Sequence, residues 1–478
     1  MIFTSWSFLV FLAITLLLYF VLSRRRRWQN ILLLVASYIS YSFWDWRFLG
    51  LLVSMTAVNY AAGWAIGRQP EGESGRGRKR FWLGMALVFD LCVLGAFKYF
   101  NFFDASLVAL LSSFGRHVDP ISLNVVLPLG ISFFTFMAIT YPFDIYRGTL
   151  THTKDFPAFA LFVAFFPTIV SGPVERAAHM LPQFQAPRVV TSDKISEGLS
   201  LIIWGFFQKI VIADNMAVIA NQVFDNYTDY HGLDLAVGIL AYTVQILADF
   251  SGYTDIARGV ARLFGFELLL NFNVPYIALN PSDFWARWHI SLSQWFRDYL
   301  YIPLGGSRKG AWRTSLNLFI TMVLVGLWHG AAVTFILWGA WHGLIQVVYR
   351  LFGERVQSTD RRIYGWKSIV SIAGRTILMF ILVAAGWVVF RSTSFEQLTY
   401  MFTNLGLETS STTLDSLWKL AYFTLPLIVV QVFQVQTTSP VVMVRLNPWV
   451  RGIAYGILLV GIMVLSQHQI SRFIYQGF

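Results

Sequence analysis

The chain has 478 residues, of which 56% are hydrophobic, 17% are aromatic and only 13% are charged, and its mean hydropathy is +0.58. A composition this apolar excludes a soluble globular protein and predicts an all-α, polytopic transmembrane helical protein. The formal net charge of +11 does not indicate nucleic-acid binding, because the Lys and Arg residues fall between the hydrophobic segments, as they do in cytoplasmic loops.

The N-terminal segment predicts the orientation of the chain. The apolar stretch 5–23 precedes the arginines at 24–27, the reverse of a signal peptide, so we expect it to stay in the membrane as a helix. Under the positive-inside rule these arginines are cytoplasmic and residue 1 lies outside. Helices expected at about 30–44 and 47–67 lead to the basic loop 68–80, which the same parity places in the cytoplasm.

Further apolar segments follow, and some are too short to span a bilayer, so we expect them to re-enter or to lie at the interface. They cover 81–102, 124–146, 156–170, 196–222, 234–250, 314–330, 331–349, 366–391, 414–435 and 448–467. Without a soluble domain or an internal repeat, they predict one membrane-embedded domain over residues 1–478. Its parts are N-terminal helices to about 120, a core at about 121–350 and C-terminal helices at about 366–470. Cys92 is the only cysteine, so no intramolecular disulfide or Cys-based metal site is expected.

A helix start is indicated at Asn280 and Pro281, since Asn is a favoured cap and Pro suits the first helical position. We expect a helix from about 281 to 300. Residues four apart on it would share one face, namely His289, Ser293 and Arg297. An adjacent aromatic stripe would hold Trp288, Trp295 and Tyr299. The same pattern also fits an amphipathic helix at the membrane interface.

The next segment carries a second histidine to membrane depth. A glycine-rich break at 305–310 contains or adjoins three basic residues that predict a cytoplasmic loop, namely Arg308, Lys309 and Arg313. A helix from Arg313 to His329 would rise roughly 24 Å, which places His329 deep in the bilayer or across it. One helix over 314–349 would be about 54 Å long, too long for one span, so we expect a turn near Gly330–Ala332.

An ionisable side chain at membrane depth is expensive and is a functional-site hypothesis by default. Three histidines fit this description, each preceded by a tryptophan: His289, His329 and His342. A neutral imidazole at His329 can take a proton from a hydroxyl, because an unperturbed histidine pKa of about 6.5 suits a general base near neutral pH. This chemistry requires no metal. The alternative is a hydrogen-bonded structural histidine, although an idle imidazole costs more in a span than in a soluble core.

Several runs of residues carry a family resemblance. The main ones are FWARWHISLS at 284–293, WFRDYLYIPLGG at 295–306 and GLWHGA at 326–331. Others are LPLGISFFTF at 127–136, FP at 166–167, SGP at 171–173, KIVIADN at 209–215 and DFSGYTDIA at 249–257. Together they resemble the membrane-bound O-acyltransferase (MBOAT) family, and within it the bacterial alginate O-acetylation membrane proteins. Met137 departs from the bacterial pattern, in which Gln is expected, so a polar contact would be missing there.

The resemblance implies acyl transfer across a membrane, with short or re-entrant helices around a central catalytic funnel. A cytoplasmic thioester and an extracytoplasmic hydroxyl would meet at a buried histidine. His329 corresponds to the family's essential histidine, and His289 to its second functional position. No cofactor would be permanently bound, and the acyl donor would be acetyl-CoA or the thioester of an acyl carrier protein.

The resemblance also implies a setting. The chain would lie in the bacterial inner membrane with a periplasmic N terminus. The acceptor would be a polysaccharide such as alginate, and a periplasmic esterase-like acetyltransferase would be a partner that completes the transfer. Relatives that D-alanylate teichoic acid share the fold, so that donor stays open.

Acyl transfer requires a base, polar groups for the developing oxyanion and exclusion of water. Candidates for the polar support are Arg287, Asp249, Ser251, Tyr253 and Asp255. For Asp249 and Asp255 the alternative is a structural network with Arg258 or Arg262. The cations at Arg308, Lys309 and Arg313 would flank a donor entrance, since they would attract the phosphates of coenzyme A or an acidic carrier protein. Their alternative role is to obey the positive-inside rule and nothing more.

Two hypotheses other than an acyltransferase also account for buried polar residues. One is a transporter or flippase for a polysaccharide or lipid, which would move its substrate without covalent change and would show repeat symmetry. The other is a catalytically silent scaffold for a periplasmic enzyme, against which the intact His289 and His329 argue.

Overall fold

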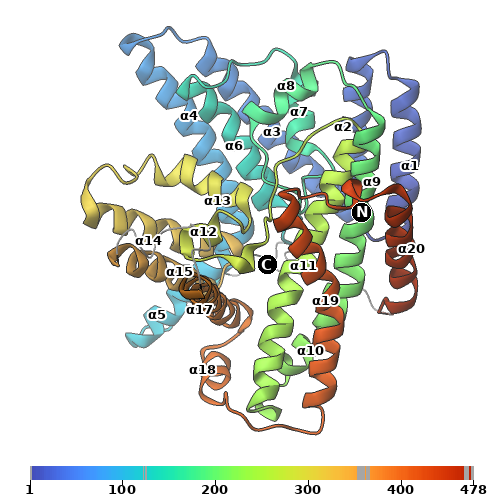
Figure 1. Cartoon of the computed structure of the whole chain (residues 1–478). Coiled ribbons are helices and arrows are strands. Elements are labelled where there is room, and N and C mark those ends of the chain that lie inside the picture. Colours follow the sequence, from blue (N-terminus) through green and yellow to red (C-terminus); the bar gives the residue numbers. More distant parts are fainter. Residues whose placement is uncertain are drawn as a thin grey trace. The chain divides into compact units, whose positions relative to one another are not determined.

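The structure is a computed structural model, and it describes residues 3–121, 123, 126–352, 361, 366–467 and 473–474. The described residues form helices joined by turns and loops, with no β-strand among them, which confirms the predicted all-α class (Figure 1). The chain divides into two compact units, which are described separately. Unit 1 comprises residues 1–198 and 257–269, and unit 2 comprises 199–256 and 270–478. The prediction of a single membrane domain is not tested by this division.

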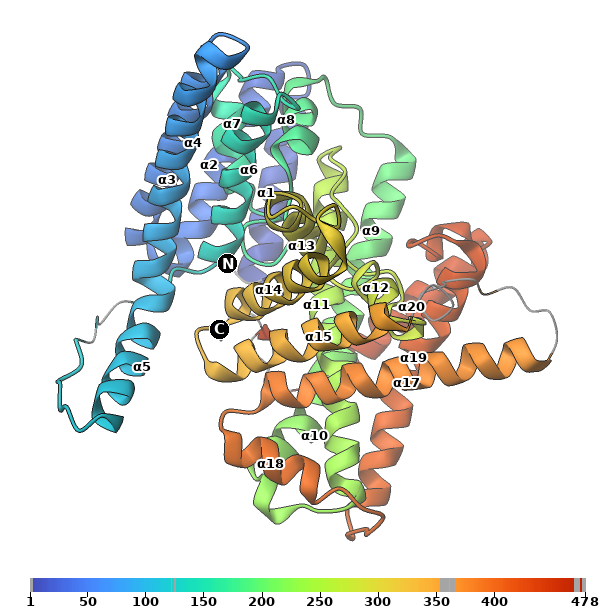
Figure 2. The same ribbon diagram turned by 90° about the vertical axis from the view of Figure 1, so that its left-hand side faces the viewer.

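The helices of unit 1 pack in neighbouring pairs. They are α1 (Trp6–Val21), α2 (Arg26–Asp45), α3 (Arg47–Gly67), α4 (Glu73–Leu94), η1 (Gly95–Tyr99), α5 (Phe100–Ser113), α6 (Ile131–Arg147), α7 (Phe156–Ala164) and α8 (Ala177–Gln185). The long helix α3 packs against both α4 and α6, and Figure 2 shows α3 and α4 side by side. Every side chain of α7 from Ala158 to Ala164 is buried, as expected of a helix that is apolar on all sides and is surrounded by other helices.

The helices of unit 2 contain the predicted site. They are η2 (Phe207–Ala213), α10 (Asp214–Asp225), η3 (Tyr227–Asp229), η4 (Pro275–Ile277), α12 (Pro281–Trp285), α13 (Ile290–Phe296), η5 (Arg297–Tyr301), α14 (Gly310–His329), α15 (Val333–Leu351), α17 (Trp366–Arg391), α18 (Phe395–Thr403), α19 (Thr413–Thr437), η6 (Met443–Arg445) and α20 (Pro448–Leu465). The unit boundaries fall within α9 (Ser192–Phe206) and α11 (Leu233–Leu263). Helices α14, α15 and α17 lie side by side in both views (Figures 1 and 2).

Two glycines allow α14 and α15 to approach closely. A Cβ atom on Gly326 would collide with the carbonyl oxygen of Phe335, and one on Gly339 would lie 2.9 Å from Cα of Val323. Small residues at such positions let helix backbones pack against each other, as they do in membrane proteins. This close packing brings the end of α14 against the side chains of α15.

Eight helical stretches among the described residues are long and apolar enough to cross a membrane. They are Arg47–Gly67, Glu73–Ser113, Ser192–Asp225, Leu233–Leu263, Gly310–His329, Trp366–Arg391, Thr413–Thr437 and Pro448–Leu465. The chain is therefore a multi-pass membrane protein, as predicted. The α1 helix is apolar but only 16 residues long, so it is not among the eight.

Several predicted boundaries were wrong. The loop expected over 68–80 is helical from Glu73 onward, since α4 starts there, and the segment expected at 234–250 continues as α11 to Leu263. The segment expected at 124–146 becomes helical only at Ile131, and its first two residues lie outside the described part. Residue 1 and residues 468–470 also lie outside it.

Candidate active site

His329 is the last residue of α14 and is 3% exposed. The chain turns directly after it and α15 begins at Val333, which confirms the predicted turn near Gly330–Ala332. Three aromatic rings pack against its imidazole, with ring centroids 4.9 Å away for Trp328, 5.0 Å for Trp338 and 5.4 Å for Phe390. The ring of His329 is thus held in an apolar pocket at the end of a candidate span.

His289 precedes α13 and is fully buried. The continuous helix expected over 281–300 is wrong, because α12 ends at Trp285 and α13 begins only at Ile290. Between them the backbone of His289 is left-handed, with φ 41°. The face predicted for His289, Ser293 and Arg297 therefore does not exist as one helical face. The predicted cap is confirmed, because the Asn280 side chain accepts a hydrogen bond from the Asp283 N–H at 2.8 Å.

The surroundings of His289 keep its imidazole neutral. Its Nδ1 lies 3.4 Å from Oδ1 of Asn271, and the same oxygen accepts a hydrogen bond from the Ser291 hydroxyl at 2.6 Å. Burial lowers the pKa of the His289 imidazole to about 3. At physiological pH the ring is therefore an uncharged hydrogen-bonding group.

Aromatic contacts join the three histidines predicted to cluster. The Trp328 ring is 6.1 Å from the ring of His289 and 4.9 Å from that of His329. On the other side of His329, the Trp338 ring also contacts the fully buried His342, at 4.9 Å. The structure thus places all three in one aromatic cluster.

The predicted support by Arg287 has a different geometry. Its Nε lies 2.6 Å from Oδ1 of Asp283, one turn earlier, and Nη2 of Arg361 lies 3.0 Å from Oδ2 of the same aspartate. Asp283 also accepts a hydrogen bond from the backbone N–H of Leu279 at 3.0 Å. Arg287 therefore belongs to an ionic clamp around α12, which fixes the helix that leads to His289.

The acidic residues of α11 form a separate polar network. Asp249 pairs with Lys209, whose Nζ lies 2.7 Å from its Oδ1. Gln208 donates a hydrogen bond to Asp255 at 3.0 Å and accepts one from Ser251. Arg262 pairs instead with two glutamates, Glu197 at 2.7 Å and Glu267 at 3.0 Å.

Sequence reasoning missed Lys209 as a site residue. It is completely buried and also lies 2.9 Å from Oδ1 of Asp214. Tyr253 completes the predicted set, and its ring lies 5.8 Å from the same ammonium group. A lysine inside the apolar segment 196–222 was a signal that could have identified the cluster.

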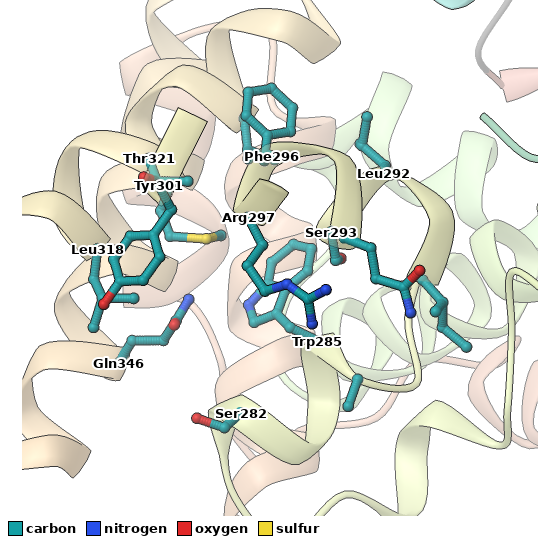
Figure 3. A pocket seen from close by; sticks show the side chains of 15 residues that line it. Ser282, Trp285, Leu292, Ser293, Phe296, Arg297, Tyr301, Leu318, Thr321 and Gln346 are labelled. Atoms are coloured by element: carbon teal, nitrogen blue, oxygen red, sulfur yellow. The ribbon is translucent and has the colours of Figure 1, made fainter. Parts of the chain in front are cut away.

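A cavity of about 360 Å³ opens beside α12, α13 and α14. Its wall is mostly apolar but includes Arg297, whose side chain lies beside Trp285 in Figure 3. Trp285 faces the cavity and also contacts two rings of the histidine cluster, Trp338 at 5.9 Å and His342 at 5.2 Å. The cavity wall therefore borders the aromatic cluster that contains His329.

A smaller, polar cavity of about 200 Å³ shares four lining residues with the first, namely Ser282, Tyr301, Leu318 and Gln346. Its cation is Arg350. The predicted entrance residues Arg308, Lys309 and Arg313 are all exposed and line neither cavity. Their role at an entrance stays a prediction, and the basic residues that line the cavities are Arg297 and Arg350.

Among the described residues, no group of three or more His, Cys, Asp or Glu side chains could hold a metal ion. Met137, where the resemblance expected Gln, is fully buried in α6.

Comparison with known proteins identifies the family. The profile of MBOAT, the membrane-bound O-acyltransferase family, matches residues 131–386. The chain is 44% identical to the "Probable alginate O-acetylase AlgI" of Pseudomonas aeruginosa, over 83% of this chain and 73% of that protein. It is 34% identical to the peptidoglycan O-acetyltransferase of Helicobacter pylori, over 81% of this chain and 76% of that protein. Similarity to the teichoic acid D-alanyltransferase of Bacillus subtilis is 29% identity over 48% of this chain and 60% of that protein. The chain, in which the buried His329 ends a candidate span, therefore belongs to the membrane-bound O-acyltransferase family.

Proposed function

We propose that this acyltransferase takes an acetyl group from a cytoplasmic thioester and moves it across the membrane, where it serves for the O-acetylation of an extracytoplasmic polysaccharide such as alginate. The observation that carries the proposal is the pair of buried histidines, His289 and His329, which share contacts with Trp328 in a chain that resembles alginate O-acetylases. Because the chain belongs to a family of acyltransferases, the transporter and silent-scaffold readings are set aside.

The reaction transfers the acetyl group from the sulfur of the donor thioester to the oxygen of the acceptor hydroxyl. His329 accepts the proton of the attacking hydroxyl as the oxygen forms a bond to the thioester carbonyl carbon. When the tetrahedral intermediate collapses, the C–S bond breaks and the proton passes from His329 to the leaving thiolate. The products are an oxygen ester and a free thiol, so no oxidant, metal or second co-reactant is required.

His289 supports this step as a neutral group. An imidazole that stays uncharged can donate one hydrogen bond from one nitrogen and accept one at the other. It would thereby orient the hydroxyl or stabilise the oxyanion without competing with His329 for a proton. The apolar rings around both histidines exclude water, which would otherwise hydrolyse the thioester.

The two cavities, which share four lining residues, suit the donor. Their shared wall leads from the polar end at Arg350 to the apolar end at Trp285, next to the histidine cluster. A phosphopantetheine arm is long and weakly polar and ends in a phosphate, so Arg350 would hold the phosphate and the apolar wall would hold the arm. Both acetyl-CoA and an acyl carrier protein present this arm.

The acceptor and its partner lie on the opposite side. We place the chain in the bacterial inner membrane with a periplasmic N terminus, because its basic loops obey the positive-inside rule in that orientation. A polysaccharide in the periplasm cannot reach a histidine at membrane depth easily. A periplasmic esterase-like acetyltransferase that receives the acetyl group and passes it to the polymer would solve this problem.

Transfer of acetate from a labelled donor tests the proposal. Membranes that contain the full-length protein, incubated with the periplasmic fraction of the same cells, radiolabelled acetyl-CoA and the secreted polysaccharide, should yield polymer-bound label that mild base releases. His329→Ala should abolish this label at an unchanged protein level, and His289→Ala should reduce it strongly. Equal labelling by wild type and His329→Ala would overturn the assignment of the base, and labelling from D-alanyl donors alone would favour the D-alanyl alternative.

A further inference from the structure

The buried charge cluster of unit 2 is connected to the histidines through α11. Lys209 and Asp214 are five residues apart, the spacing that the π-helical segment η2 brings onto one face. Asp214 and Asp249 both face the ammonium group of Lys209, at 2.9 and 2.7 Å. Buried carboxylates gain from additional hydrogen-bond donors, because water cannot reach them.

One such donor comes from a distant part of the sequence. The backbone N–H of Ile474 donates a hydrogen bond to Oδ2 of Asp249 at 2.8 Å. The neighbouring Phe473 is 1% exposed, and its ring packs against Tyr253 at 4.4 Å and Phe250 at 5.7 Å. Phe473 and Ile474 therefore contact both apolar and polar side chains of the same stretch of α11.

This stretch of α11 also contacts the site. The edge of the Phe250 ring meets the imidazole of His289, with centroids 4.6 Å apart and planes at 88°. Phe250 thus lies between Phe473 and His289, and a change at Phe473 alters the packing that sets the angle of the His289 ring. A left-handed backbone at a non-glycine residue persists only where the surroundings impose it, and the contact with Phe250 is part of those surroundings.

We propose that Phe473 and Ile474 form a positioning element of the acyl-transfer centre: Ile474 fixes Asp249, Phe473 fixes Phe250, and Phe250 in turn orients His289. The inference rests on the proposed function, since it assigns to His289 a role in that transfer. Neither residue touches the reacting atoms.

The first test removes the ring of Phe473. In membranes from cells that also contain the proposed periplasmic partner, with labelled acetyl-CoA as donor and alginate as acceptor, Phe473→Ala should lower kcat at least tenfold and leave the KM for acetyl-CoA within twofold. Phe473→Leu, which refills most of the space, should recover a large part of kcat. The matched control is Phe224→Ala, because Phe224 is also 1% exposed in unit 2 but packs on Tyr242. It should lower the melting temperature similarly and keep kcat.

The second test removes only the backbone donor. Ile474→Pro lacks the backbone N–H that donates the hydrogen bond to Asp249, whereas Ile474→Ala keeps this N–H. We expect Ile474→Pro to lower kcat several-fold and Ile474→Ala to stay near the wild type. The two Ile474 variants still test the positioning role if Phe473→Ala does not insert into membranes.

The outcomes separate this inference from the proposed function. If wild type transfers no more acetyl than His329→Ala, the proposed function fails. If wild type is active but Phe473→Ala and Ile474→Pro keep wild-type kcat, only the positioning role is overturned. A fall in kcat equal to that of Phe224→Ala would show a general loss of stability and would overturn it too.

Discussion

His289 is one of three non-glycine residues with a positive φ in the described part of the chain, and its φ is 41°. A left-handed conformation costs an L-amino acid about 1–2 kcal/mol, because Cβ approaches the following carbonyl oxygen. Residues 286–289 join the short helices α12 and α13, and His289 is the last of them. The strain is thus located at a residue to which the family resemblance assigns function.

Two substitutions of His289 separate its strain from its chemistry. His289→Ala removes the imidazole but keeps the Cβ atom, whereas His289→Gly removes both. We expect acetyl transfer to fall strongly in both variants, and we expect His289→Gly to have the higher melting temperature in detergent, by the few degrees that the relieved strain allows. A lower melting temperature for His289→Gly than for His289→Ala would contradict this account of the backbone.

At the same scale, the sequence pattern located the three histidines but not all of their neighbours. Histidine and tryptophan in apolar sequence are visible in the composition of a segment, and the turn after His329 follows from the length of a span. The left-handed break at His289 could not be predicted from the sequence, because the apolar residues keep their helical spacing across it. Lys209 was missed because its partner Asp249 is 40 positions away in the sequence.

At the scale of elements, the close packing of α14 and α15 should be sensitive to one methyl-sized group. Gly339→Val would insert a side chain where the Cβ already meets Val323, and such overpacking costs about 1–3 kcal/mol. We expect a lower melting temperature and lower acetyl transfer, since Trp338 next to it contacts His329. Gly452→Val on α20 is the control, because nothing lies within 4 Å of its Cβ position.

If Gly339→Val and Gly452→Val have equal stability and activity, the tight contact between these helices does not position the site.

The elements themselves were predictable to different degrees. The helix expected at 366–391 is found with those bounds, and the polar run 392–394 follows its end. The helix at 73–80 was missed because Gly, Glu and Arg in that stretch resemble a loop, yet α4 extends through them. The extension of α11 from 250 to 263 carries Asp255, Arg258 and Arg262, polar residues that helices inside a large protein tolerate when partners exist.

The cavities make a prediction about which cations serve the donor. Arg297→Ala and Arg350→Ala should raise the apparent KM for acetyl-CoA, because these two arginines line the cavities. Reversal of the exposed cations in Arg308→Glu, Lys309→Glu and Arg313→Glu should change this KM less, provided that the topology is unchanged. Initial rates over a range of acetyl-CoA concentrations measure both effects. A larger rise in KM for the loop variant would place the entrance at the loop.

At the scale of the whole molecule, the charge distribution predicts the topology. Cysteines placed singly at Arg25, Arg78 and Lys309, in a Cys92→Ala background, should resist an impermeant maleimide in intact spheroplasts, because all three positions are expected in the cytoplasm. Permeabilised cells are the control, since there the same positions should react. Rapid labelling at two of them in intact spheroplasts would reverse the orientation and with it the side from which the donor enters.

The central claim is that His329 is the base for the transfer of acetyl groups destined for a surface polysaccharide. The most direct measurement is the base-labile acetate on the secreted polymer, quantified by mass spectrometry in a deletion strain that carries either wild type or His329→Ala at equal membrane levels. The account predicts that wild type restores acetylation and that His329→Ala leaves the polymer as unacetylated as the deletion. Equal acetate in the two strains, or none with the wild type, would contradict it.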